Sequence, residues 1–196
     1  RRMIMERPEQ QYIDLFTQYE AMICRHSAEV LNAPRSKAFA DFERLGFPTR
    51  KQEDYKYTDV GRYFAPDYGL NLNRLEIPVN PYEVFKCDVP NMSTSLYFVV
   101  NDAFDRHGSP TASLPEGVEF GSLCEIATRR PELIKKYYAH LADTSEDALA
   151  AFNTLFAQDG VVMYVPKGVV VERPIQLVNI LRADVATLVN RRLLII

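Results

Sequence analysis

The feature that most constrains the fold is the stretch of residues 153–181, which reads NTLFAQDGVVMYVPKGVVVERPIQLVNIL. Short apolar runs alternate there with polar corners, first at Pro166-Lys167-Gly168 and then at Glu172-Arg173-Pro174. Short strands at nearly even spacing are typical of a β-solenoid or a β-sandwich. Leu193, Leu194, Ile195 and Ile196 look like another such strand. We therefore expect a solenoid that begins near residue 160 and is cut off soon after it starts.

The bulk composition is that of a globular protein and argues against several classes of partner. The chain has 196 residues, of which 47% are hydrophobic and 25% charged, both ordinary values. A net charge of −3 predicts no footprint for nucleic acid. No apolar run approaches the roughly 18 residues that span a bilayer. Cys24, Cys87 and Cys124 are far apart and odd in number, so we expect buried thiols in a cytoplasmic protein rather than a disulfide framework.

Apolar side chains recur at helical spacing in residues 1–65. One stripe predicts a helix over about residues 10–31, and a second predicts a helix that begins after Pro34 and ends at Gly46. Phe47 is expected to fold back on Phe42. The two helices would form a helical hairpin, followed by a short helix that Thr58 caps.

The middle of the chain predicts a connecting region and then a second subdomain. Residues 66–94 are rich in Pro and Asn with weak periodicity, as expected of a long surface connection. Residues 95–159 begin with a continuous apolar run, 96–100, which favours a strand with both faces covered. Three helices follow it, and the turn at Asp159-Gly160 then leads into the strands.

The three helices of residues 95–159 have recognisable start signals. Ser122 and Glu125 form a capping box for the first. Pro131 opens the second, which we expect to include Leu141. Thr144 or Ser145 is expected to cap the third.

The sequence contains no recognisable motif for metal, nucleophilic or phosphate chemistry. C-x-x-C, H-x-x-x-H and G-x-S-x-G are all absent, and the glycines are not clustered as a phosphate loop requires. His107 lies in a Gly-Ser-Pro context, where a solvated side chain is expected. Asp143, Glu146 and Asp147 are expected in the first turn of a helix, where their negative charges interact favourably with the helix dipole. We predict no catalytic, cofactor-binding or metal-binding residue in this chain.

Residues 50–58, RKQEDYKYT, form a charged segment with two tyrosines. Tyr55 and Tyr57 would face the same way in an extended strand and could form a binding strip. The alternative, which we favour, is that the tyrosines anchor a loop on the helical hairpin while the charges stay solvated.

Together, these two segments resemble the SufB/SufD family of scaffold subunits in the SUF iron–sulfur cluster assembly system. The first is similar to that family's R…E-x-W-K-Y-T segment, and Tyr55 stands where Trp is usual, a difference that bears on packing. The second is similar to its N…D-G…V-P…G-V…P-I segment, which enters a β-helix. The positions that carry the resemblance are Arg50, Glu53, Tyr55, Lys56, Tyr57, Thr58, Asn153, Asp159, Gly160, Pro166, Gly168, Pro174 and Ile175.

The resemblance implies a mixed α/β (α+β) fold in four segments. These are an N-terminal helical hairpin (1–65), a connecting region (66–94), a strand with a three-helix subdomain (95–159) and the first coils of a truncated right-handed parallel β-helix (160–196). In the family, the β-helix pairs with a SufB-type paralogue and a C-terminal helical domain docks a SufC-type ATPase. The residues that hold a transient Fe–S cluster lie late in the β-helix, so the resemblance places none of them here.

Three functional hypotheses follow. The wholly N-terminal match and the absence of cysteine motifs favour the SufD branch over a SufB-type paralogue. The third, a truncated β-helix polysaccharide lyase or acyltransferase, would need acidic or histidine side chains along its coils, where residues 161–181 offer only Glu172 at a corner. We therefore expect a non-enzymatic cytoplasmic scaffold without nucleic-acid or membrane partners.

The last four residues also carry a prediction about assembly. Solenoid coils bury their faces against neighbouring coils, so Leu193, Leu194, Ile195 and Ile196 would form an open apolar edge. We expect self-association through this edge. Light scattering at high concentration would detect it, and a strictly monomeric chain would contradict it.

Overall fold

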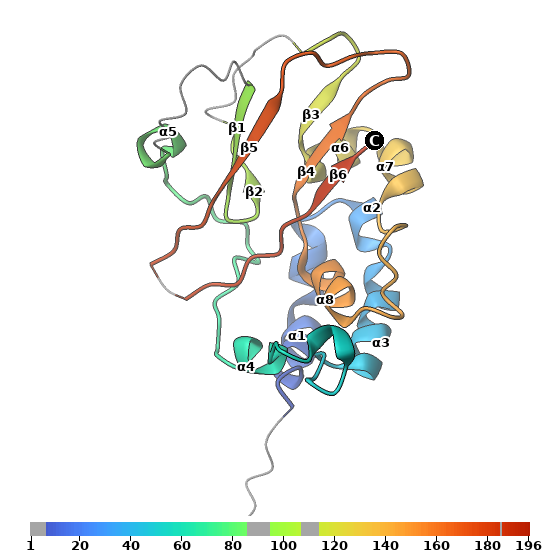
Figure 1. Cartoon of the computed structure of the whole chain (residues 1–196), viewed down its shortest axis with the longest axis vertical. Coiled ribbons are helices and arrows are strands. Elements are labelled where there is room, and N and C mark those ends of the chain that lie inside the picture. The colour runs from blue at the N-terminus through green and yellow to red at the C-terminus, as the bar shows by residue number, and fades with distance from the viewer. Residues whose placement is uncertain (1–6, 86–94, 107–113, 185) are drawn as a thin grey trace, which may run out of the picture.

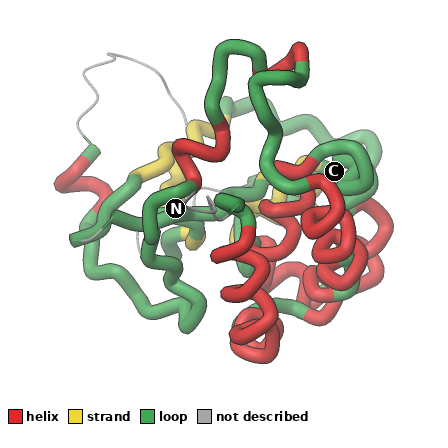
Figure 2. Tube along the Cα trace, turned by 90° about the horizontal axis from the view of Figure 1, so that it is seen from below, coloured by secondary structure: helices red, strands yellow, loops and turns green. Residues whose placement is uncertain are grey.

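The helices and strands occupy separate regions of the molecule (Figure 1). The computed structural model describes residues 7–85, 95–106, 114–184 and 186–196. Helices α1 (Gln10–Arg25), α2 (Glu29–Asn32), α3 (Arg35–Leu45) and α8 (Ala148–Phe156) gather below two small sheets. Seen from below, most of the helical turns lie to one side of the strands (Figure 2). The mixed α/β class predicted from the sequence is confirmed, and none of the described helices is long and apolar enough to cross a membrane.

Aromatic rings form the centre of the helical region. The Tyr12 ring of α1 lies 5.0 Å from that of Phe152 and 5.7 Å from that of Phe47, both edge-on. Such pairs add about 0.5–1.5 kcal/mol each to the free energy of burial. Gly46 ends α3 with a φ of 62°, and Phe47 then folds back to lie 5.2 Å from Phe42. The predicted helix end and fold-back are therefore confirmed.

The single helix predicted over residues 10–31 is wrong, because the chain breaks after Arg25. Ala28 is extended, with φ −91° and ψ 148°, before α2 begins. The break allows Ala28 and Leu31 to join a second core with the buried side chains of residues 123–138, whereas α1 belongs to the first core. Periodicity does not reveal the break, since both pieces keep an apolar face.

Two predicted helix caps are also wrong. Asp59, not Thr58, caps α4 (Val60–Phe64), and its carboxylate accepts the backbone N–H of Arg62 at 3.2 Å. Asp147 caps α8, and its carboxylate accepts the N–H groups of Leu149 and Ala150 at 2.8 and 3.0 Å. In both cases a carboxylate closer to the helix replaces the expected hydroxyl.

The expected cap Thr144 has a different partner. Its hydroxyl donates to the carboxylate of Asp41 in α3 at 2.6 Å, and Lys37 Nζ donates to the same oxygen at 2.7 Å. These hydrogen bonds lower the pKa of Asp41 to about 2. Helix α7 (Pro131–Tyr137) begins at Pro131 as predicted but ends before Leu141, which is 98% exposed instead of packed inside a helix.

The strands form two small mixed sheets. In the first, β1 (Ser95–Val100) lies between β2 (Ala103–Phe104), antiparallel, and β5 (Ile175–Ile180), parallel. In the second, β4 (Val161–Tyr164) lies between β3 (Glu119–Ser122), antiparallel, and β6 (Leu193–Ile195), parallel. The covered strand predicted over residues 96–100 is confirmed by β1. The described residues do not contain a β-helix, so that part of the fold stays a prediction.

The remaining helices connect these parts. Helix α6 (Leu123–Arg129) follows β3 directly, and the connecting region holds the single turn of α5 (Pro81–Val84). A 3₁₀ turn, η1, covers Glu53–Tyr55. Within the connecting region Leu72 is buried in the first core, so this part of the chain packs against α1. Cys87 and His107 lie outside the described residues.

Gly160 allows a close backbone approach where the neighbouring parallel strands β4 and β6 begin. A Cβ there would collide with the backbone carbonyl oxygen of Arg192. This oxygen accepts the N–H of Val161 at 2.8 Å, so moving it away would break that hydrogen bond. We expect Gly160→Ala to lower the free energy of unfolding by about 1–3 kcal/mol, measured by urea denaturation. Gly121→Ala is the matched control, because the nearest atoms to its Cβ are side-chain carbons at 3.9 Å. Equal stability of the two variants would contradict this reading.

Candidate functional site

The D-G motif ties the helical region to the second sheet. Asp159 is 8% exposed, and its carboxylate accepts the hydroxyl of Ser122 at 2.8 Å and the backbone N–H of Cys124 at 2.9 Å. The same Ser122 oxygen accepts the N–H of Glu125 at 3.2 Å, which confirms the Ser122 half of the predicted capping box. The Glu125 carboxylate pairs with Arg106. Asp159 therefore braces the start of α6 against the start of β4.

Asn153 braces the approach to β6. Its side-chain amide donates to the carbonyl of Arg191 at 3.1 Å, and its amide oxygen accepts Arg192 Nε at 2.9 Å. Arg192 also donates to the hydroxyl of Thr154 at 3.0 Å and lies 4.9 Å from the ring of Tyr138. The Tyr138 hydroxyl is buried without a hydrogen-bond partner in the described structure. Asn153 is thus a structural link between α8 and a strand some forty residues later.

The remaining positions of the second motif shape the path from β4 to β5. The Pro166 carbonyl accepts the N–H of Val169 at 3.1 Å, and Gly168 adopts a φ of 83° that favours glycine. The Pro174 carbonyl accepts the N–H of Ser95 at 2.9 Å, and Ile175 pairs with Ser95. Each of these positions has a role in backbone geometry.

The first motif forms an exposed turn. Tyr55 is half-buried against the first core, whereas Tyr57 is 88% exposed with Lys56 Nζ 5.5 Å from its ring centre. Because η1 turns the chain at Tyr55, the two tyrosines do not share one face, and the extended strip is wrong. Arg50 and Thr58 are exposed, and Glu53 pairs with Lys56 at 3.3 Å. The prediction that the tyrosines anchor this loop on the helical hairpin is therefore correct for Tyr55 and wrong for Tyr57.

Arg35 is a structural residue that the sequence analysis missed. Its guanidinium is 1% exposed and uses all five of its N–H donors. Two donate to Thr154 and Leu155 carbonyls at 2.9 and 2.6 Å, and one to the Ala157 carbonyl at 2.7 Å. The others reach Asn32 Oδ1 and Ser27 Oγ at 3.0 and 3.1 Å. The positive charge therefore caps the C-terminus of α8, where the helix dipole favours it.

Burial lowers the pKa of Arg35, but arginine starts so high that it stays charged. A signal for this residue was present in the sequence. Arg35 lies three and seven residues before Ala38 and Phe42, on the apolar face of α3. A charged residue on such a face requires a buried set of partners, although the spacing does not say which.

Gln158 is a second missed residue. It is 2% exposed, and its side-chain amide donates to the carbonyls of Ile23 and Leu72 at 3.2 and 2.9 Å. It thereby joins the end of α1 and the connecting region to the chain that follows α8.

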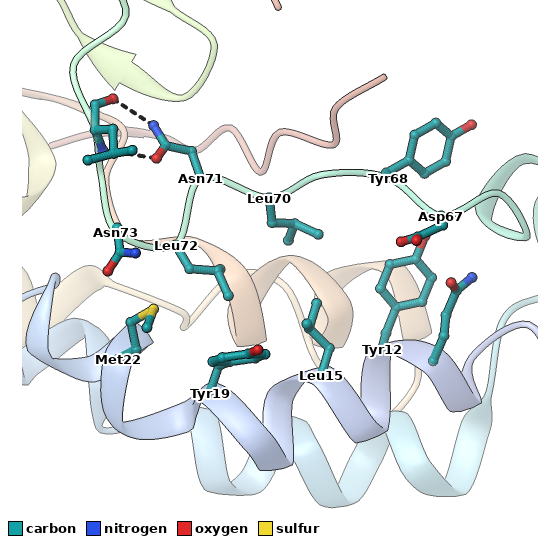
Figure 3. A pocket seen from close by; sticks show the side chains of 12 residues that line it. Tyr12, Leu15, Tyr19, Met22, Asp67, Tyr68, Leu70, Asn71, Leu72 and Asn73 are labelled. Atoms are coloured by element: carbon teal, nitrogen blue, oxygen red, sulfur yellow. Dashed lines mark hydrogen bonds between the residues drawn. The ribbon is translucent and has the colours of Figure 1, made fainter. Parts of the chain in front are cut away.

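A groove of about 560 Å³ lies between α1 and residues 67–75 (Figure 3). Leu15 and Tyr19 project from α1 towards Leu70 and Leu72 on the opposite wall (Figure 3). At one end, burial together with Tyr68 and Asp67 raises the pKa of Tyr12 to about 12. The Tyr12 hydroxyl stays protonated and donates to the Phe64 carbonyl at 2.8 Å. The sequence analysis did not anticipate this groove.

The described residues provide little for redox or metal chemistry. Burial raises the pKa of the thiols of Cys24 and Cys124, which disfavours the reactive thiolate. No group of three or more His, Cys, Asp or Glu residues able to hold a metal ion occurs in the part of the chain that the structure describes.

Buried polar side chains thus brace a helical region onto two small mixed sheets, and together these form a module of the mixed α/β class. Residues 6–177 match the family described as the SufBD protein N-terminal region, so the chain belongs to the SufBD family.

Related proteins extend this comparison. The chain is 27% identical over 145 residues to an iron–sulfur cluster assembly SufBD family protein, ycf24, of Trieres chinensis, covering 68% of this chain and 30% of the relative. It is 30% identical over 152 residues to the chloroplastic SufBD family protein ABCI8 of Arabidopsis thaliana, covering 72% and 27%. It is 30% identical over 110 residues to the iron–sulfur cluster assembly protein SufD of Bacillus subtilis, covering 55% and 25%. The matched regions thus span less than a third of these relatives.

The role of Arg35 predicts a large effect of its removal. Arg35→Met would leave at least three buried carbonyls without donors, and we expect the free energy of unfolding to fall by at least about 3 kcal/mol. Arg35→Lys should recover part of this loss, because it restores the charge but fewer donors. Arg25→Met is the control, since Arg25 is exposed at the end of α1, and should change stability by less than about 0.5 kcal/mol. Urea denaturation measures all three, and a similar loss in Arg25→Met and Arg35→Met would refute the role.

Proposed function

We propose that this chain is the N-terminal part of a SufD-like scaffold for iron–sulfur cluster assembly, working with a SufB-type paralogue and a SufC-type ATPase. The observation that carries the proposal is the family match over residues 6–177, which contains both motifs in order. The names of the relatives add iron–sulfur cluster assembly as their shared role. In this proposal the protein is a scaffold rather than an enzyme.

The sheets support a role as the entrance to a parallel β-helix. The chain leaves β4, crosses to the other sheet as β5 and returns as β6 beside β4, parallel to it, with Val161 opposite Leu193. A solenoid coil returns to its starting face in the same way. Within the described residues, β5 and β6 each pair on one side only. We propose that further coils of the full-length protein stack on these edges.

The last four residues lie at one of these edges. Leu193 and Ile195 are 54% and 67% exposed, while Leu194 and Ile196 pack against the second core. This placement is compatible with the predicted self-association, and it fits a further coil of the same protein equally well.

The SufB-type paralogue remains the second candidate, because the matched family is described as SufBD and several relatives are named only as SufBD family proteins. The absence of cysteine motifs favours the SufD type. No observation favours the polysaccharide lyase or acyltransferase alternative, since Glu172 is an exposed corner residue. We further propose a cytoplasmic location, and that the transient Fe–S cluster belongs to residues of the full-length complex outside this chain.

Co-purification of the full-length gene product tests the proposal. When it is tagged and expressed with the SufB-type and SufC-type proteins of the same genome, we expect all three to elute together. Recovery of the tagged protein without either subunit would refute the assignment of partners. In a second expression with the SufC-type and SufD-type proteins of the same genome, co-elution with both would make it the SufB paralogue.

Iron analysis tests the placement of the cluster. Residues 1–196, purified without oxygen after expression with the same partners, should carry no stoichiometric iron and show no ATPase activity. One or more iron atoms per chain would contradict the proposal that the cluster ligands lie elsewhere.

A further inference from the structure

We draw no further inference here: the strongest candidate, the cavity of about 260 Å³ that Leu177 and Asn179 of β5 and Leu193 of β6 line together with Arg191, carries nothing beyond the proposed function, because β5 and β6 are the strands on which we already place further coils and nothing in the described residues shows what would fill the cavity.

Discussion

The guanidinium of Arg35 is the interaction on which the rest of the structure depends. The Arg35 side chain projects from α3 into the interior of the protein. Three of its five N–H donors bond the backbone carbonyls of Thr154, Leu155 and Ala157 at the C-terminus of α8. The other two reach Ser27, in the break between α1 and α2, and Asn32, the last residue of α2. No carboxylate among the described residues neutralises this charge, so the helix terminus and the neutral oxygens must do so. One side chain thus sets where α8 ends relative to α1 and α3.

Three residues that follow α8 depend on the position of its C-terminus. Gln158 holds the end of α1 and the connecting region, Asp159 holds the start of α6, and Gly160 lies against the backbone before β6. The same stretch therefore fixes the start of the second sheet and, through Leu72, the wall of the groove. The arrangement of the D-G motif and that of the groove wall therefore both depend on the short segment that follows α8.

Some of this could be predicted from the sequence and some could not. The faces of α1, α3 and α8, the strand β1, the helix start at Pro131 and the chain reversal at Gly46 follow from local patterns of three to seven residues. The break after Arg25 and the caps at Asp59 and Asp147 were missed because several candidate residues lie within a turn of each other, and tertiary contacts choose between them. Tyr57 was misplaced for a similar reason, since one 3₁₀ turn reverses the face of a side chain.

The sequence by itself determined the class of the fold, because periodicity and turn residues act over short distances, and the resemblance of two segments indicated the family and the positions that carry its motifs. Only the tertiary structure decided what those positions do. Asn153 finds its partners at Arg191 and Arg192, and Arg35 finds its partners some 120 residues away on α8. Likewise β4 and β5, close in sequence, belong to different sheets. A buried hydrogen-bonding group needs a partner, and this need can be read from the sequence. Which residue becomes the partner depends on how the whole chain packs.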